Sequence, residues 1–288
     1  MILYRDTAKK TRFNGEMKLV KTIIITGASS GIGAATAVAF AKQGANLVLA
    51  ARRMEKLQEV AAQCKAAGAK EVLVMHCDVS RREEVERCVD ETVARFGRLD
   101  VMIANAGYGF MAKVHETTEE QFDAIMAVNV KGTWYAMQAA ARMMLKQERL
   151  AGRKKDGRGH IVAVSSAAGK RGLPLGGLYS MTKAAQLSLA QAMRVEMADE
   201  GIYVSTVHPM TTDTEFFEVS SSKSRVKSNG LGHLYSAESV ARKIVRVIEK
   251  PKPEVWPVWW SNLLLSIGSF WPGLGDRVLG RAVRRRVR

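Results

Sequence analysis

The sequence of 288 residues, 47% hydrophobic and 25% charged, has the length and composition of a globular protein that buries one large core, so we expect a single domain. The three cysteines form an odd set without metal-ligand spacing, which indicates reduced thiols in a cytoplasmic protein and no metal site. The formal net charge of +16 is unusual. Two basic runs in the sequence, at 153–158 and 277–288, either attract phosphates or anionic lipid or form solvated tails. We expect no nucleic-acid partner.

The amino-terminal segment before the first predicted strand is polar and basic. It lacks the sustained apolar core of a signal peptide, so we do not expect secretion. We expect residues 1–17 to be a flexible lead-in, residues 18–257 to form the folded domain, and residues 258–288 to form an extension.

A glycine-rich loop follows the first predicted strand, which covers residues 20–26. The loop has the spacing G-x-x-x-G-x-G from Gly27 to Gly33, and a helical run over 34–42 comes directly after it. Glycines let the backbone approach a pyrophosphate closely, and the free N–H groups at a helix start supply donors and partial positive charge. The strand, loop and helix together predict a nucleotide-binding site.

Two arginines follow the second predicted strand, which covers residues 46–51. Dinucleotide-binding folds place an acidic residue at this point to hold the ribose 2′-hydroxyl, but this sequence has Arg52 and Arg53. Their planar donors suit a 2′-phosphate, so NADP(H) is favoured over NAD(H). The alternative is that both arginines face solvent at the start of a helix over 54–67.

A third predicted strand, 71–77, ends at Asp78 and Val79. The Asp78 carboxylate could accept a hydrogen bond from the adenine amino group. Alternatively, Asp78 and Ser80 cap the helix expected over 81–96.

A fourth predicted strand, 99–104, leads into the run Asn105-Ala106-Gly107. These small residues either allow the backbone to lie near a ligand or make a turn. A long helix is then expected over 119–146, and it carries Asn129, a poor helix former, between two valines. Asn129 either holds a water in a proton relay or is a hydrogen-bonded core amide.

Three further polar residues have spacing that suits acid–base chemistry. Ser166 follows a predicted strand over 160–164, and Tyr179 and Lys183 are four residues apart, on one face of a predicted helix. A lysine ammonium beside a phenol favours the phenolate and lowers the pKa of the phenol from about 10. The alternative for Tyr179 and Lys183 alone is an ordinary amphipathic helix.

Strands, helices and glycine loops alternate along the chain, which predicts an α/β doubly wound parallel sheet of about seven strands with ligands at the strands' carboxyl ends. The sequence resembles the short-chain dehydrogenase/reductase family from about residue 18 to residue 257. The resemblance rests on motifs in the family's order: 26–33, Asp78-Val79, Asn105-Ala106-Gly107, Asn129, Ser166, and Tyr179 with Lys183.

The resemblance implies a Rossmann-like oxidoreductase that transfers a hydride between NADP(H) and a carbonyl or secondary alcohol. It implies that Tyr179 is the general acid/base, that Lys183 lowers its pKa and holds the nicotinamide ribose, that Ser166 orients the substrate oxygen, and that Asn129 completes the relay. It also implies a cofactor site formed by Gly27, Ser29, Ser30, Gly31, Ile32, Gly33, Arg52, Arg53, Asp78, Val79, Asn105, Ala106, Gly107, Tyr179, Lys183, Pro209, Thr212 and Thr214.

After the predicted strand 202–207, the family usually has a proline followed by a glycine. This sequence has Pro209 followed by Met210. Residues 210–236 are expected to be a lid over the substrate, and Phe216 and Phe217 suggest an apolar ligand; a disordered surface loop is the alternative.

Residues 255–275 carry no charge and contain four tryptophans, and an arginine-rich tail follows them. Three interpretations of this segment stay open: peripheral contact of residues 255–288 with an anionic membrane, an apolar wall of the substrate pocket, or a subunit contact. We expect a homodimer or homotetramer that is cytoplasmic, with or without attachment to the inner face of a membrane.

Two other functions compete with this assignment. One is reduction of a 3-oxoacyl thioester on an acidic carrier protein, which the basic surface would dock. The other is a non-catalytic dinucleotide-binding sensor or scaffold that kept the fold.

Overall fold

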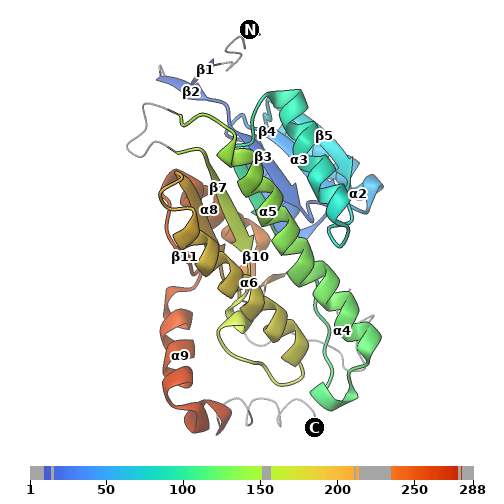
Figure 1. Cartoon of the computed structure of the whole chain (residues 1–288), viewed down its shortest axis with the longest axis vertical. Coiled ribbons are helices and arrows are strands. Elements are labelled where there is room, and N and C mark those ends of the chain that lie inside the picture. Colours follow the sequence, from blue (N-terminus) through green and yellow to red (C-terminus); the bar gives the residue numbers. More distant parts are fainter. Residues whose placement is uncertain are drawn as a thin grey trace.

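In this computed structural model, the described parts of the chain are residues 10–13, 16–150, 157–210, 212–213, 235–277 and 280. Seven parallel strands form the central sheet, in the order β11-β8-β7-β6-β3-β4-β5 (Figure 1). Their bounds are β3 (Thr22–Thr26), β4 (Asn46–Ala51), β5 (Glu71–His76), β6 (Val101–Ala104), β7 (Gly159–Val164), β8 (Ile202–Val207) and β11 (Glu254–Val255). The predicted doubly wound parallel sheet is confirmed, and β11 is a strand that the sequence did not predict.

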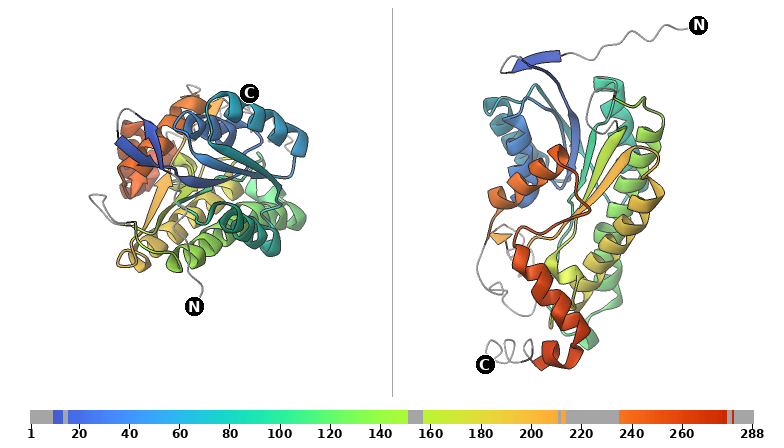
Figure 2. Two further views of the ribbon diagram at one scale, coloured as in Figure 1. Left: turned by 90° about the horizontal axis from the view of Figure 1, so that it is seen from above. Right: turned by 90° about the vertical axis from the view of Figure 1, so that its left-hand side faces the viewer.

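Helices cover both faces of the sheet, because every second side chain of a strand points to the opposite face. In β3, Ile23 and Ile25 belong to one buried cluster and Ile24 to the other. Figure 2 shows the two helical layers on either side of the sheet. The first layer contains α1 (Gly31–Ala41), α2 (Met54–Ala66) and α8 (Ala237–Glu249), and the second contains α3 (Arg82–Phe96), α5 (Gly132–Leu145) and α6 (Gly177–Glu196).

The long helix expected over 119–146 is present as one helical stretch over 119–145, but it is not α-helical throughout. It consists of α4 (Glu119–Ile125), a turn of π-helix named η2 (Met126–Lys131), and α5. The wider π turn shifts the register of the backbone hydrogen bonds. Asn129 lies inside this turn, so the poor helix former stands where the helix is irregular.

The remaining described elements are short or lie at the ends of the chain. They are β1 (Lys10–Phe13), β2 (Glu16–Leu19), η1 (Val114–Glu116), η3 (Ala167–Gly169), β9 (Thr212–Asp213), β10 (Tyr235–Ser236) and α9 (Trp259–Phe270). Strands β1 and β2 pair antiparallel, so the expected lead-in 1–17 contains strand structure. Of the expected lid, Phe216 and Phe217 lie outside the described residues.

Helix α9 lies beyond the carboxyl ends of the strands. Strand β11 runs parallel to β8 and ends at Val255, and α9 begins four residues later. Figures 1 and 2 show α9 at the end of the molecule opposite to the amino terminus. The extension therefore lies at the edge of the sheet where ligands bind in folds of this type.

Candidate active site

The glycine loop lies at the carboxyl end of β3, and its backbone leaves no room for a Cβ at Gly27 or Gly33. Gly27 and Gly31 have φ angles of +66° and +55°, which L-residues with side chains rarely adopt. A Cβ on Gly33 would lie 2.3 Å from the Gly27 carbonyl oxygen. Ser30 precedes α1, and Gly31 and Ile32 begin it, so bare backbone N–H groups face this edge as in a phosphate cradle.

The run after β6 supports this loop. The Asn105 side-chain amide donates to the Thr26 carbonyl oxygen (2.9 Å), and the backbone amides of Asn105 and Ala106 donate to the Thr26 hydroxyl (3.0 and 3.1 Å). A Cβ on Gly27 would lie 2.8 Å from the Ala106 Cα. The predicted Asn105-Ala106-Gly107 turn therefore holds the glycine loop in place.

Both predicted arginines lie beside the loop, in different ways. The Arg53 guanidinium donates to the hydroxyl oxygens of Ser29 (3.1 Å) and Ser30 (2.7 Å). Arg52 lies 4.0 Å from the Asp78 carboxylate, and its side chain is 65% exposed. Arg53 thus contacts the glycine loop directly, while Arg52 extends toward Asp78 at the end of β5.

Asp78 stabilises the turn after β5 and does not cap α3. Its Oδ1 accepts from the Ser80 backbone N–H (3.0 Å) and hydroxyl (2.7 Å), whereas α3 begins later, after Arg81. Burial raises the pKa of Asp78, but the hydrogen bonds from Ser80 and the charges of Arg52 and Arg81 outweigh burial and lower the pKa overall. Val79, next to it, is buried against the start of α5.

Ser166, Tyr179 and Lys183 meet at the carboxyl end of β7, as the sequence predicted. A hydrogen bond joins the Ser166 and Tyr179 hydroxyl groups. The Lys183 ammonium nitrogen lies 5.6 Å from the centre of the Tyr179 ring. Lys183 is only 4% exposed, and it donates to the Val164 carbonyl oxygen at 2.9 Å.

Burial sets the proton affinities of this pair. It raises the pKa of Tyr179 to about 12, although the hydrogen bond with Ser166 acts in the opposite direction. It also lowers the pKa of Lys183 to about 7. Removal from water disfavours the charged form of both groups, so burial outweighs the effect of Ser166 on the pKa of Tyr179, and a lowering of that pKa by Lys183 stays a prediction.

Asn129 is completely buried and its side chain is held in place. Its side-chain oxygen accepts from the Tyr108 N–H (3.0 Å), and its amide donates to the Tyr108 carbonyl oxygen (2.8 Å) and the Thr182 hydroxyl (3.0 Å). A Cβ on Gly107 would lie 3.1 Å from the Asn129 side-chain oxygen and 3.5 Å from the Lys183 nitrogen. Gly107 therefore lies against both Asn129 and Lys183, which places these two side chains near each other.

Gln186 is a site residue that the sequence analysis missed. Its amide nitrogen donates to the Asn129 carbonyl oxygen (2.6 Å) and to the Thr133 hydroxyl (2.7 Å), and its oxygen accepts from Lys183 (3.0 Å). It therefore links the carbonyl at the π turn to the catalytic ammonium. A signal was present, since Gln186 lies three residues after Lys183, on the same face of α6.

The segment after β8 carries the last predicted cofactor residues. The Pro209 carbonyl oxygen accepts from the Ala167 N–H (2.9 Å), so it lies beside Ser166. Thr212 is buried and its hydroxyl donates to the Met210 carbonyl oxygen (2.9 Å). Thr214 lies outside the described residues.

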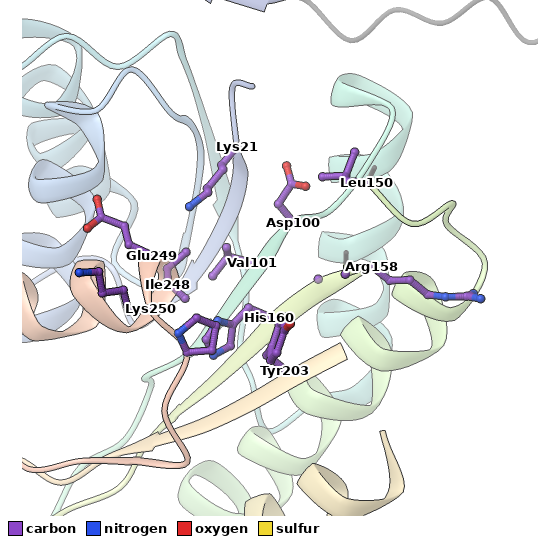
Figure 3. Close-up of a pocket in the computed structure, with 13 residues that line it drawn as sticks. Lys21, Asp100, Val101, Leu150, Arg158, His160, Tyr203, Ile248, Glu249 and Lys250 are labelled. Carbon is purple, nitrogen blue, oxygen red and sulfur yellow. The ribbon is translucent and has the colours of Figure 1, made fainter. Parts of the chain in front are cut away.

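A separate cavity of about 650 Å³ lies at the amino ends of the strands, among His160, Tyr203, Lys21 and Asp100 (Figure 3). Burial lowers the pKa of His160 to about 3, so its ring is neutral, and it bonds Ser205 at 2.8 Å. None of the predicted catalytic residues lines this cavity. Within the described ranges, no group of three or more His, Cys, Asp or Glu residues is placed to hold a metal ion.

Known proteins match the chain over most of its length. The sequence profile described as short chain dehydrogenase matches residues 21–225. An uncharacterized oxidoreductase of Listeria innocua is 34% identical over 239 residues, which are 81% of this chain and 92% of that protein. An alcohol dehydrogenase structure from the archaeon Thermococcus sibiricus, complexed with 5-hydroxy-NADP, is 28% identical with a TM-score of 0.70, covering 82% of this chain and 95% of its own. A 3-ketoacyl-ACP reductase from Sinorhizobium meliloti is also 28% identical with a TM-score of 0.70, covering 82% and 96%.

Proposed function

Since this chain belongs to the short-chain dehydrogenase family and is a pyridine-nucleotide-dependent oxidoreductase of CH–OH or C=O groups, we propose that it acts on an apolar carbonyl or secondary alcohol with NADP(H). The observation that carries the proposal is the meeting of Ser166, Tyr179 and Lys183 beside the glycine loop. A screen of ketones and alcohols of graded chain length, followed by nicotinamide absorbance, tests it.

Tyr179, Ser166 and Lys183 each have a different role in the proposed reaction. The nicotinamide supplies the hydride for reduction and takes it in oxidation. Tyr179 gives its proton to the substrate oxygen in reduction, and a phenol with a pKa of about 12 keeps that proton at neutral pH. Ser166 orients the same oxygen, and the buried Lys183 favours negative charge on the phenol as the proton leaves.

The residues present fit a dinucleotide with a 2′-phosphate. Gly33 lets the start of α1 pack directly on the Gly27 carbonyl oxygen, and such a tight glycine loop before a helix suits a pyrophosphate. Arg52 and Arg53 follow β4, where dinucleotide-binding folds place an acidic residue for the ribose hydroxyl, and with Ser30 they offer donors to a 2′-phosphate. The lowered pKa of Asp78 keeps this carboxylate charged and able to accept from an adenine amino group.

The wild type is expected to prefer NADPH over NADH, and Arg52→Asp is expected to erase or reverse that preference. The substitution removes a phosphate partner and supplies a carboxylate that accepts from a ribose hydroxyl. The ratio of kcat/KM for the two cofactors measures the effect. Arg142→Asp, an exposed arginine on α5, is the matched control and should leave the ratio unchanged. A wild type that uses NADH better would disprove the role of Arg52.

Gln186→Leu and Gln186→Glu are expected to move the pH profile in opposite directions. The leucine removes one acceptor of the Lys183 ammonium, which keeps its bond to the Val164 carbonyl oxygen, so the pKa of Lys183 falls and the basic limb of carbonyl reduction moves to lower pH. The glutamate adds a negative charge that raises the pKa of Lys183 and moves this limb to higher pH. Turnover of Gln186→Leu should fall roughly tenfold, the scale of one hydrogen bond to a charged group.

A matched control is Gln191→Leu on the same helix, because Gln191 bonds Glu254 outside the site. Its pH profile should stay that of the wild type. Equal shifts in all three variants would mean that Gln186 acts only on the fold.

A second candidate function is reduction of a 3-oxoacyl thioester on a carrier protein. The similarity to the Sinorhizobium meliloti reductase favours it, as does the net charge of +16, which suits an acidic carrier. Saturation by a 3-oxoacyl carrier at far lower concentration than by the matching free thioester would support it. A homodimer or homotetramer stays a prediction in either case, and a non-catalytic sensor would not need an intact set of catalytic residues.

A further inference from the structure

Helix α9 and the turn after it present a continuous apolar surface to the outside. Six large side chains are exposed along this segment, and the four that lie within α9 recur every three or four residues, which places those four on one side of the helix. Phe270 is 80% exposed and Trp271 is 64% exposed, far more than large apolar side chains in a folded domain usually are. We name this surface the α9 apolar face; it consists of Trp260, Leu263, Ile267, Phe270, Trp271 and Leu274.

The α9 apolar face is fixed to the catalytic loop by one arginine. Arg171 lies between Ser166 and α6, and its guanidinium donates to the carbonyl oxygens of Gly268 (2.6 Å) and Pro272 (3.3 Å) and to Asp276 (2.6 Å). A Cβ at Gly275 would lie 2.8 Å from this guanidinium, so the glycine lets the turn close around it. Helix α9 therefore keeps its position relative to the loop that carries Ser166.

A second contact fixes the start of the extension. The Trp256 ring stacks on His208 with ring centres 4.3 Å apart and an angle of 8° between the planes. His208 is completely buried at the end of β8, and its Nδ1 lies 3.4 Å from the Ser166 carbonyl oxygen. The α9 apolar face thus belongs to the same rigid edge as the catalytic residues.

The arginines that follow the α9 apolar face in the sequence favour an anionic bilayer over a second copy of the chain as its binding partner. The sequence has six arginines between residues 277 and 288 and no acidic residue after Asp276. Two copies of the chain carry two such arginine runs, and because like charges repel, the charge of the sequence disfavours a contact between copies. An anionic bilayer would instead attract the arginines while the aromatic side chains enter the headgroup layer.

The dimensions of α9 suit contact in the plane of a bilayer. A helix of 12 residues is about 18 Å long, whereas the hydrocarbon core of a bilayer is about 30 Å thick. No helix in the described parts of the chain is long and apolar enough to cross a membrane.

We propose that the α9 apolar face docks on an anionic membrane surface and turns the catalytic edge of the sheet toward the lipid, so that the substrate is an apolar carbonyl or alcohol dissolved in the bilayer. The docking follows from the exposed face and its arginines. The substrate class rests on the proposed function, because it assumes that Tyr179 reduces or forms a carbonyl group.

Sedimentation with liposomes tests the docking. The full chain is expected to bind vesicles of phosphatidylcholine with about one third phosphatidylserine, and to be released by high salt because screening weakens the arginine contacts. Phe270→Ser combined with Trp271→Ser should weaken binding at least tenfold. Val195→Ser on α6 is the matched control, since Val195 is 78% exposed on another surface. Absence of vesicle binding by the full chain, or binding that the double variant retains, would overturn the docking.

An activity measurement tests the substrate class separately. With a long-chain ketone, anionic vesicles should raise kcat/KM of the wild type several-fold, and the double variant should lose this stimulation. Both proteins should reduce a short water-soluble ketone equally well. If the protein has no activity on any ketone or alcohol, the proposed function is refuted. The docking is then still tested by the sedimentation experiment alone. If the double variant instead converts a dimer into monomers and the full chain ignores vesicles, the face is a contact between copies and this inference is wrong.

Discussion

Replacing Tyr179 by phenylalanine is expected to lower turnover roughly a hundredfold or more and to leave the affinity for NADPH almost unchanged. Under the proposed function, the phenol donates the proton to the substrate oxygen, whereas the glycine loop and the arginines hold most of the cofactor. Only the hydroxyl is lost, and the ring keeps its place above the Lys183 nitrogen at 5.6 Å. Single-turnover absorbance gives the chemical step, and quenching of tryptophan fluorescence by NADPH gives the affinity.

Tyr203→Phe is the matched control for this experiment. Tyr203 lines the cavity at the amino ends of the strands, so its hydroxyl lies away from the catalytic edge. Its loss should leave turnover within about twofold of the wild type, as for a substitution away from the reacting groups. Near-normal turnover of Tyr179→Phe would refute the assigned mechanism.

Lys183→Met is expected to damage both turnover and cofactor binding. Turnover should fall roughly a hundredfold, because the charge that stabilises the developing phenolate is lost. The affinity for NADPH should fall roughly tenfold, because a lysine here holds the nicotinamide ribose under the proposed function. Kinetics and a binding titration separate the two effects.

The pH dependence of stability gives Lys183→Met a second readout. Burial lowers the pKa of folded Lys183 from its ordinary value of 10.5 to about 7. Between these values the unfolded chain binds a proton that the folded chain does not, so the contribution of Lys183 to the free energy of unfolding rises with pH. Denaturant unfolding at a series of pH values should show that Lys183→Met removes this rise. Parallel curves for the two proteins would mean that Lys183 stays charged in the folded chain.

The sequence predicted the parts of the fold that depend on local pattern. Six strands of the sheet are long apolar runs, and the glycine loop follows the first of them, so both were visible in advance. Strand β11 was missed because it has only two residues, Glu254 and Val255, between Pro253 and Pro257. The sequence did not predict the π turn at Asn129. One extra residue in a single helical turn hardly changes the spacing of apolar residues along a long helix, so the pattern looks the same with or without it.

The sequence predicted which residues come together at the site, but it did not predict their pKa values. Ser166, Tyr179 and Lys183 follow from spacing, but the raised pKa of Tyr179 depends on burial by residues distant in the sequence. The same limit explains Gln186, whose role depends on the approach of α6 to the π turn. A single sequence shows which groups are present, while their proton affinities depend on what surrounds them.

The segment from Asn105 to Tyr108 has a consequence for changing the cofactor by design. Asn105 holds the glycine loop through Thr26, and the Tyr108 backbone holds the Asn129 side chain only three residues further on. A substitution that moves the glycine loop therefore also disturbs the catalytic asparagine, so the two functions cannot be altered independently there. Arg53 is tied to the same loop through Ser29 and Ser30, whereas Arg52 lies beside Asp78 and its side chain is 65% exposed. Under the proposed function, a redesign that exchanges NADP for NAD is therefore better begun at Arg52 than at Arg53.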